Sequence, residues 1–132
     1  MTLTVFVPGE PAPQGSKKHV GRGIMVEASK KLAPWRKQVA SVVGSAYTGE
    51  LVEGPVEGSL MFVMPRPKYL AKKATPLHIK RPDVDKLTRA VLDGITGVYL
   101  KDDSQAYKLL VEKRTAELDE EPGVHIDLKE TI

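Results

Sequence analysis

In three segments of the chain, largely apolar residues alternate with largely polar ones. This period of two is typical of a β-strand. The segments are residues 2–7, 107–112 and 124–129. Glu121-Pro122-Gly123 predicts a turn between the last two segments, which we therefore expect to form an antiparallel pair. Residues 60–64 are a continuous apolar run, which predicts a buried strand in the same sheet as residues 2–7.

The period of a helix appears first in the segment that follows residue 28. Ser29 and Pro34 are start signals for this helix. Its apolar residues fall on one stripe, which consists of Trp35, Val39, Val42, Val43 and Ala46. We therefore expect Trp35 to pack in the core rather than to stack on a base. A short strand is expected just before the helix, at residues 24–26.

A second helix is expected to begin near Asp83 and to run for about three turns. One of its faces is apolar and consists of Leu87, Val91 and Ile95. Another face is ionic and consists of Asp85, Arg89 and Asp93. Strands interleaved with two main helices predict an α+β fold, in which residues 1–132 form a single compact domain with a mixed β-sheet.

The composition limits the class of protein and its compartment. A chain of 132 residues is long enough to bury a core of its own as one domain. It contains no cysteine, so neither disulfides nor thiolate metal sites contribute, and a reducing cytosol is the natural compartment. No secretory signal is evident, and no stretch approaches the ~20 apolar residues of a membrane span. We expect a cytoplasmic protein, encoded by a bacterium or a phage, with no membrane partner.

Positive charge is concentrated in the first two thirds of the chain. Residues 1–82 carry 13 Lys and Arg against 5 Asp and Glu, whereas residues 112–132 carry 3 against 7. A basic surface attracts polyanions, nucleic acid first, because neutralised phosphates release their condensed counterions. The alternative is a solvated lysine surface on an ordinary domain, and composition alone does not decide between the two.

Two loops rich in Pro or Gly, residues 10–23 and 65–82, hold much of this charge. We expect both to face a phosphate backbone, although the first could equally be a mobile surface loop. The cations expected to contact DNA are Lys17, Lys18, Arg22, Lys72, Lys73, Lys80 and Arg81. Tyr69 could stack on an exposed base, but we expect its ring to pack against the domain.

Two pairs of acidic residues, Asp83 with Asp85 and Asp102 with Asp103, flank the second helix and the Gly-containing break after it. Carboxylates from two segments suit a hard ion such as Mg²⁺, which is usually held by one or two carboxylates, water and substrate phosphate. Asp83 could instead cap the helix, and Arg89 could be a structural bridge to neighbouring aspartates. Converging carboxylates repel each other unless a cation lies between them, so we expect the two pairs to meet in a metal site.

This stretch resembles the RusA family of Holliday-junction resolvases, whose signature is Asp-x-Asp-Asn at the start of a helix and Asp-Asp-x-Gln after a short loop. On this resemblance the metal ligands are Asp83, Asp85 and Asp103. The chain departs from the family at two positions, where Lys86 replaces an Asn and Arg89 replaces the catalytic Lys. An arginine can stabilise charge on phosphate, but it does not exchange protons near neutral pH. Lys86 could supply an ammonium instead, although the helical turn of 100° per residue is expected to direct it elsewhere.

The resemblance implies a Mg²⁺-dependent endodeoxyribonuclease, with Mn²⁺ as the alternative ion. It also implies a homodimer that resolves four-way junctions in recombination and repair by paired nicks in opposite strands. The reaction would be in-line attack of water on a phosphodiester, with the metal ion polarising the phosphoryl oxygen.

Other classes of protein remain open at this point. A non-catalytic module that binds branched DNA would keep the basic loops, but would have no use for three converging aspartates. A Mn²⁺-dependent nucleotide-sugar transferase could use Asp-x-Asp, but the chain is short for two substrate sites and its loops are very basic. A nuclease of broader specificity, acting on flaps or other branched DNA, fits the sequence as well as a strict junction resolvase.

Overall fold

The computed structural model describes residues 1–15 and 28–131. The strand expected at residues 24–26 lies outside the described residues, and so do Lys17, Lys18 and Arg22. No helix in the described part of the chain is long and apolar enough to cross a membrane.

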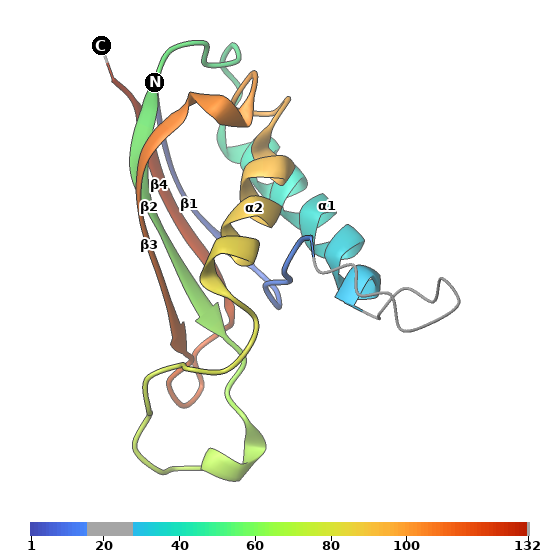
Figure 1. The fold of residues 1–132 in the computed structure, drawn as a ribbon, viewed down its shortest axis with the longest axis vertical. Coiled ribbons are helices and arrows are strands. Elements are labelled where there is room, and N and C mark those ends of the chain that lie inside the picture. Colours follow the sequence, from blue (N-terminus) through green and yellow to red (C-terminus); the bar gives the residue numbers. More distant parts are fainter. Residues whose placement is uncertain (16–27, 132) are drawn as a thin grey trace.

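A mixed sheet of four strands forms one layer of the molecule (Figure 1). The strands are β1 (Thr2–Pro8), β2 (Val56–Met64), β3 (Ala106–Thr115) and β4 (Gly123–Glu130), and their order across the sheet is β1-β4-β2-β3. β4 is antiparallel to both of its neighbours, whereas β2 and β3 are parallel. The predicted α+β class with a mixed sheet is confirmed.

The antiparallel pair expected between residues 107–112 and 124–129 is wrong, because β2 lies between β3 and β4. The connection between them is longer than a hairpin turn, and it begins by pairing with β2: the Ala116 amide donates to the Met64 carbonyl at 2.8 Å. It then crosses the end of β2, a step of two strand spacings or about 10 Å. Alternation identified both strands, but it carries no information about which strand each one pairs with.

Two helices, α1 (Ala28–Ala46) and α2 (Val84–Ile95), cover the same face of the sheet (Figure 1). Trp35 is only 3% exposed and lies in the core with Val39 and Val43, as predicted. Val42 is half-buried, and Ala46 at the end of the stripe is exposed. Pro34 does not start α1 but lies inside it. Leu32, one turn before Trp35, also packs against the core and continues the stripe toward the start of the helix.

The two helices approach each other closely at Gly94 of α2. A Cβ at this position would lie 3.0 Å from a methyl carbon of Val39 and 3.3 Å from the Arg36 carbonyl oxygen, both on α1. Leu87, Val91 and Ile95 on the inner face of α2 are fully buried. The opposite face of α2 is therefore held outward, where the candidate residues lie.

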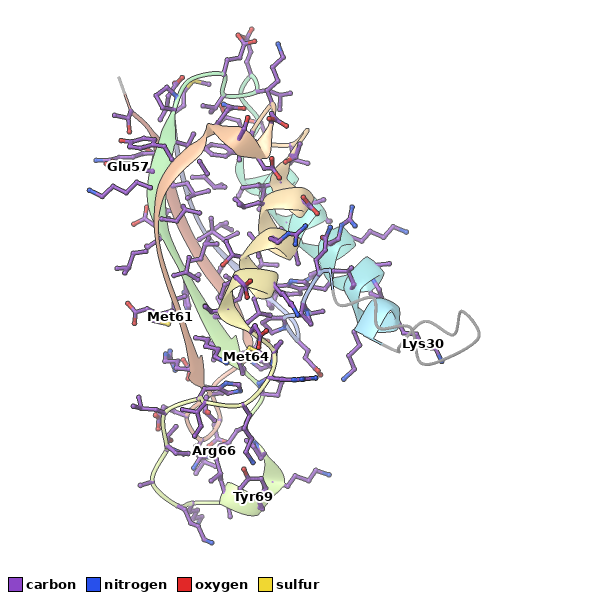
Figure 2. All side chains as sticks on the ribbon, viewed as in Figure 1. Lys30, Glu57, Met61, Met64, Arg66 and Tyr69 are labelled. Carbon is purple, nitrogen blue, oxygen red and sulfur yellow. The ribbon has the colours of Figure 1, made fainter. Side chains whose placement is uncertain are left out.

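No helix among the described residues covers the second face of the sheet. Glu57 and Met61 of β2 project from this uncovered face, whereas Met64 projects toward the helices (Figure 2). β3 is one edge of the sheet, since β2 is its one strand partner among the described residues.

Candidate functional site

Asp83 occupies the N-cap position of α2, but its side chain makes no capping hydrogen bond. Its carboxylate is 55% exposed and lies 3.7 Å from the ammonium of Lys86. Capping therefore does not account for this aspartate. Lys86 also reaches back over the first turn to Asp83, contrary to the expectation that the helical turn directs it elsewhere.

Asp85 and Arg89 lie on the exposed side of α2, one turn apart. In the part of the chain that the structure describes, neither side chain takes part in an ion pair. The structural bridge considered for Arg89 is thus not formed. The guanidinium instead lies over Gly15, where a Cβ would be 3.2 Å from one of its terminal nitrogens. The segment before Gly15 is fixed to the same helix by a hydrogen bond of 3.1 Å, which the backbone amide of Gln14 donates to the backbone carbonyl of Lys86.

Asp102 and Asp103 differ in what their carboxylates already bind. Asp102 is the N-cap of a short 3₁₀ helix, η2 (Asp103–Gln105), and accepts hydrogen bonds from the hydroxyl and the amide of Ser104. The hydroxyl of Ser104 is the larger cause of a lowered pKa at Asp102, and the amide adds to it. The exposed carboxylate of Asp103 has no such partner among the described residues. Asp103 is therefore the better placed of the two to bind a ligand.

Gln105 holds this turn in place, a role that sequence reasoning missed. Its side-chain amide donates to the carbonyls of Val52 and Gly54 at 2.7 and 2.9 Å, and its side-chain oxygen accepts from the Asp102 amide at 2.7 Å. The Asp-Asp-x-Gln order was the available signal, and the hydrogen bonds give a physical reason for the Gln.

The two acidic pairs do not meet within one chain. Asp83 and Asp85 lie at the N-terminal end of α2, whereas η2 lies beyond its C-terminal end (Figure 1). A helix of 12 residues is about 18 Å long. Consistent with this separation, no group of three or more metal-ligating side chains is found among the described residues. The expected convergence is absent because the length of α2 separates the two pairs and the hydrogen bonds of Gln105 fix the second pair at its far end.

Lys113 of β3 is a second residue that sequence reasoning missed. Its ammonium donates to the carbonyls of Lys80 and Pro82 at 2.6 and 2.9 Å, directly before Asp83. The sequence did contain a signal, because Lys113 falls on the same face of β3 as Leu109 and Val111, which pack against the core. A lysine in a series of inward residues needs acceptors, and here they are the carbonyls that lead into α2.

The basic segment between β2 and α2 forms a loop that extends beyond the end of the sheet (Figure 2). Arg66 closes it, because its guanidinium donates to the Ala71, Lys73 and Ala116 carbonyls and to the Thr75 hydroxyl. A 3₁₀ turn, η1 (Lys68–Leu70), lies within it. The four cations expected to contact DNA from this loop are all exposed: Lys72, Lys73, Lys80 and Arg81.

The expectation that the ring of Tyr69 packs against the domain is wrong. It is 63% exposed, and its partner is Lys80, which donates to the Tyr69 hydroxyl at 3.1 Å and lies 5.3 Å from the ring centroid. Of the three residues of η1, only Leu70 is buried, so the turn is anchored to the domain by Leu70 and not by the ring of Tyr69.

The residues at the start of α2 fit a hard divalent cation. Asp83 and Asp85 offer exposed carboxylate oxygens that accept no hydrogen bond in the described chain, and only Asp83 has an ion-pair partner there, Lys86 at 3.7 Å. Two such carboxylates, with water and a substrate phosphate completing the shell, are a common environment for Mg²⁺. The chain contains no cysteine, so no thiolate is available as a metal ligand.

Comparison with known proteins gives two matches of nearly full length. The uncharacterized protein YqaN of Bacillus subtilis (strain 168) is 29% identical over an alignment of 139 positions, which covers 97% of this chain and 94% of that protein. The model of the endodeoxyribonuclease RusA family matches residues 8–129, a range that contains both acidic pairs and the basic loop. The chain therefore belongs to the RusA family of endodeoxyribonucleases.

Proposed function

We propose that the protein is a Mg²⁺-dependent endonuclease that resolves four-way DNA junctions by paired nicks, acting as a homodimer. The observation that carries this proposal is the pair of exposed carboxylates, Asp83 and Asp85, at the end of a basic loop. Phosphodiester hydrolysis needs this combination, since cations hold the DNA backbone while carboxylates hold the metal ion. Family membership supports the same chemistry.

A bound Mg²⁺ would polarise the phosphoryl oxygen and lower the pKa of the attacking water. Asp83 and Asp85 would hold the ion, and Lys113 would keep the turn before Asp83 in position through the Pro82 carbonyl. Arg89 would lie beside the scissile phosphate and stabilise its developing negative charge. The loop cations Lys72, Lys73, Lys80 and Arg81 would bind the DNA backbone, as would Lys17, Lys18 and Arg22.

Asp103 would complete the metal site of a second copy of the chain. Within one chain it is separated from Asp83 by the length of α2, and the hydrogen bonds of Gln105 oppose a movement of η2 toward the helix start. A homodimer offers another route, because each Asp103 can approach the first turn of the partner's α2. Each site would then contain two carboxylates from one chain and one from the other, and a monomer would lack a complete site.

A test of the function is to incubate the purified protein with a synthetic four-way junction and, separately, with a linear duplex of the same arm sequence. We expect symmetric nicks in opposite strands of the junction, dependent on Mg²⁺ and lost with EDTA, and little cleavage of the duplex. Equal cleavage of both substrates would favour a general nuclease. Tight junction binding with no cleavage in either Mg²⁺ or Mn²⁺ would favour a non-catalytic DNA-binding protein.

A further inference from the structure

We infer that two copies of the chain join edge to edge through β3, in an antiparallel register centred on Leu110, to form a continuous sheet of eight strands. This inference rests on the homodimer in the proposed function, and it specifies the surface and register that the dimer uses.

The free edge of β3 is a ready partner for another strand. β3 spans Ala106–Thr115, which is 10 residues, and within the part of the chain that the structure describes it pairs only with β2. Long, unprotected edge strands present unpaired amides and carbonyls and pair readily with a second chain. Leu110, in the middle of this edge, is 63% exposed, which is the largest exposed fraction among the large apolar residues of the four strands. A leucine so placed is covered when a second copy pairs here.

The charges on β3 select one register. Lys108, Leu110 and Glu112 stand in register with Glu57, Ser59 and Met61, so they belong to the uncovered face of the sheet. If two copies pair antiparallel around Leu110, each Leu110 lies opposite the other. Lys108 then lies opposite Glu112 of the partner subunit, and the symmetry makes this contact twice. On the inner face, Leu109 lies opposite the partner's Val111.

Neighbouring registers lose this complementarity. A register centred on Lys108 places the two Lys108 residues opposite each other, and one centred on Glu112 does the same for the two Glu112 residues. In both cases like charges repel. Centring on Val111 places Arg114 opposite the partner's Lys108, and centring on Leu109 places Lys108 opposite the partner's Leu110. A shift of one residue relative to the partner would oppose inner-face and outer-face side chains. Neither Lys108 nor Glu112 forms a salt bridge within the described residues, and the attraction of Lys108 to its neighbour Glu57 is only a minor cause of the lowered pKa of Glu57.

The same register serves the proposed metal site. Antiparallel pairing places the start of one β3 beside the end of the partner's β3. Asp103 is the first residue of η2, which directly precedes the start of β3. Near its end, Lys113 binds the Lys80 and Pro82 carbonyls that lead to Asp83. Strand pairing therefore brings Asp103 of one copy toward Asp83 of the other, although the register was chosen from charge and exposure alone.

Leu110→Cys tests the pairing by cross-linking, because the native chain has no cysteine. Directly opposed residues of antiparallel strands have Cα atoms about 4.5–5.5 Å apart, within the roughly 4.4–6.8 Å that a disulfide spans. Leu118→Cys is the matched control, since Leu118 is 52% exposed but lies in the connection after β3. We expect mild oxidation to convert most of the Leu110→Cys protein, and little of the Leu118→Cys protein, into a covalent dimer.

Charge reversal provides a second readout by sedimentation equilibrium at low salt. Lys108→Glu and Glu112→Lys should each weaken the dimer by about tenfold, because each creates two like-charge contacts. The double variant should recover wild-type association. A wild-type chain that dimerises and cleaves junctions, while Leu110→Cys cross-links no better than Leu118→Cys, would overturn the strand pairing alone. Efficient cross-linking of Leu110→Cys by a protein that cleaves no junction would instead leave the pairing intact and refute the nuclease proposal.

Discussion

Asp85→Asn is expected to lower the turnover of a four-way junction by on the order of 10³-fold, because it removes an anionic metal ligand and the several kcal/mol that the ion contributes at the transition state. Asp83→Asn and Asp103→Asn should have the same effect. Junction binding should be kept or become tighter, since a negative charge next to the phosphate has been removed. Single-turnover cleavage at saturating Mg²⁺ and a binding titration in Ca²⁺ or EDTA measure the two effects separately.

Asp93→Asn is the matched control for these variants. Asp93 lies on the same helix, two turns beyond Asp85, and is outside the proposed ligand set. Its replacement should leave turnover within a few-fold of wild type. Near wild-type turnover in two of the three ligand variants would refute the metal-site assignment.

Arg89→Ala is expected to lower turnover by about 10²- to 10³-fold, the usual loss when one charge partner of a transition state is removed. Arg89 is exposed and has no ion-pair partner in the described chain, so its positive charge remains available to a phosphate. Arg89→Lys should keep most of the activity, because either cation can neutralise phosphate. Steady-state kinetics on a junction substrate, with a thermal melt of each variant, measures both the catalytic and the structural effect.

A structural role for Arg89 makes different predictions. Without an ion pair to lose, Arg89→Ala should melt within a few degrees of wild type, whereas a structural role would lower the melting temperature markedly. A well-folded Arg89→Ala protein with full nuclease activity would remove Arg89 from the mechanism.

The sequence predicted those parts of the fold that depend on the burial of one face. Trp35, Val39 and Val43 are buried where the helical period placed them, and so are Leu87, Val91 and Ile95. Side-chain periodicity reports such burial directly. It does not report strand partners, which is why the pairing of β3 with β2, rather than with β4, was missed. The environment of Tyr69 was missed because it depends on how Arg66 closes an irregular loop.

The candidate site could be predicted only in its chemistry. Spacing along α2 correctly separated Asp85 and Arg89 from the buried face, since both belong to a single regular element. The position of Asp103 relative to Asp83 depends instead on the length of α2 and on the bonds of Gln105, which a local pattern does not contain. The contribution of Lys113 comes from β3 and joins the site only through tertiary structure.

Mixing two inactive variants tests most directly whether two chains build each metal site. Differently tagged Asp85→Asn and Asp103→Asn chains are co-expressed, and the heterodimer is purified through both tags. If Asp103 acts on the partner's helix, one site carries both substitutions and the other carries none, so the heterodimer should nick a four-way junction in one strand although each parent homodimer is inactive. If all three ligands belonged to one chain, both sites would be broken, and a heterodimer as inactive as its parents would contradict the shared site.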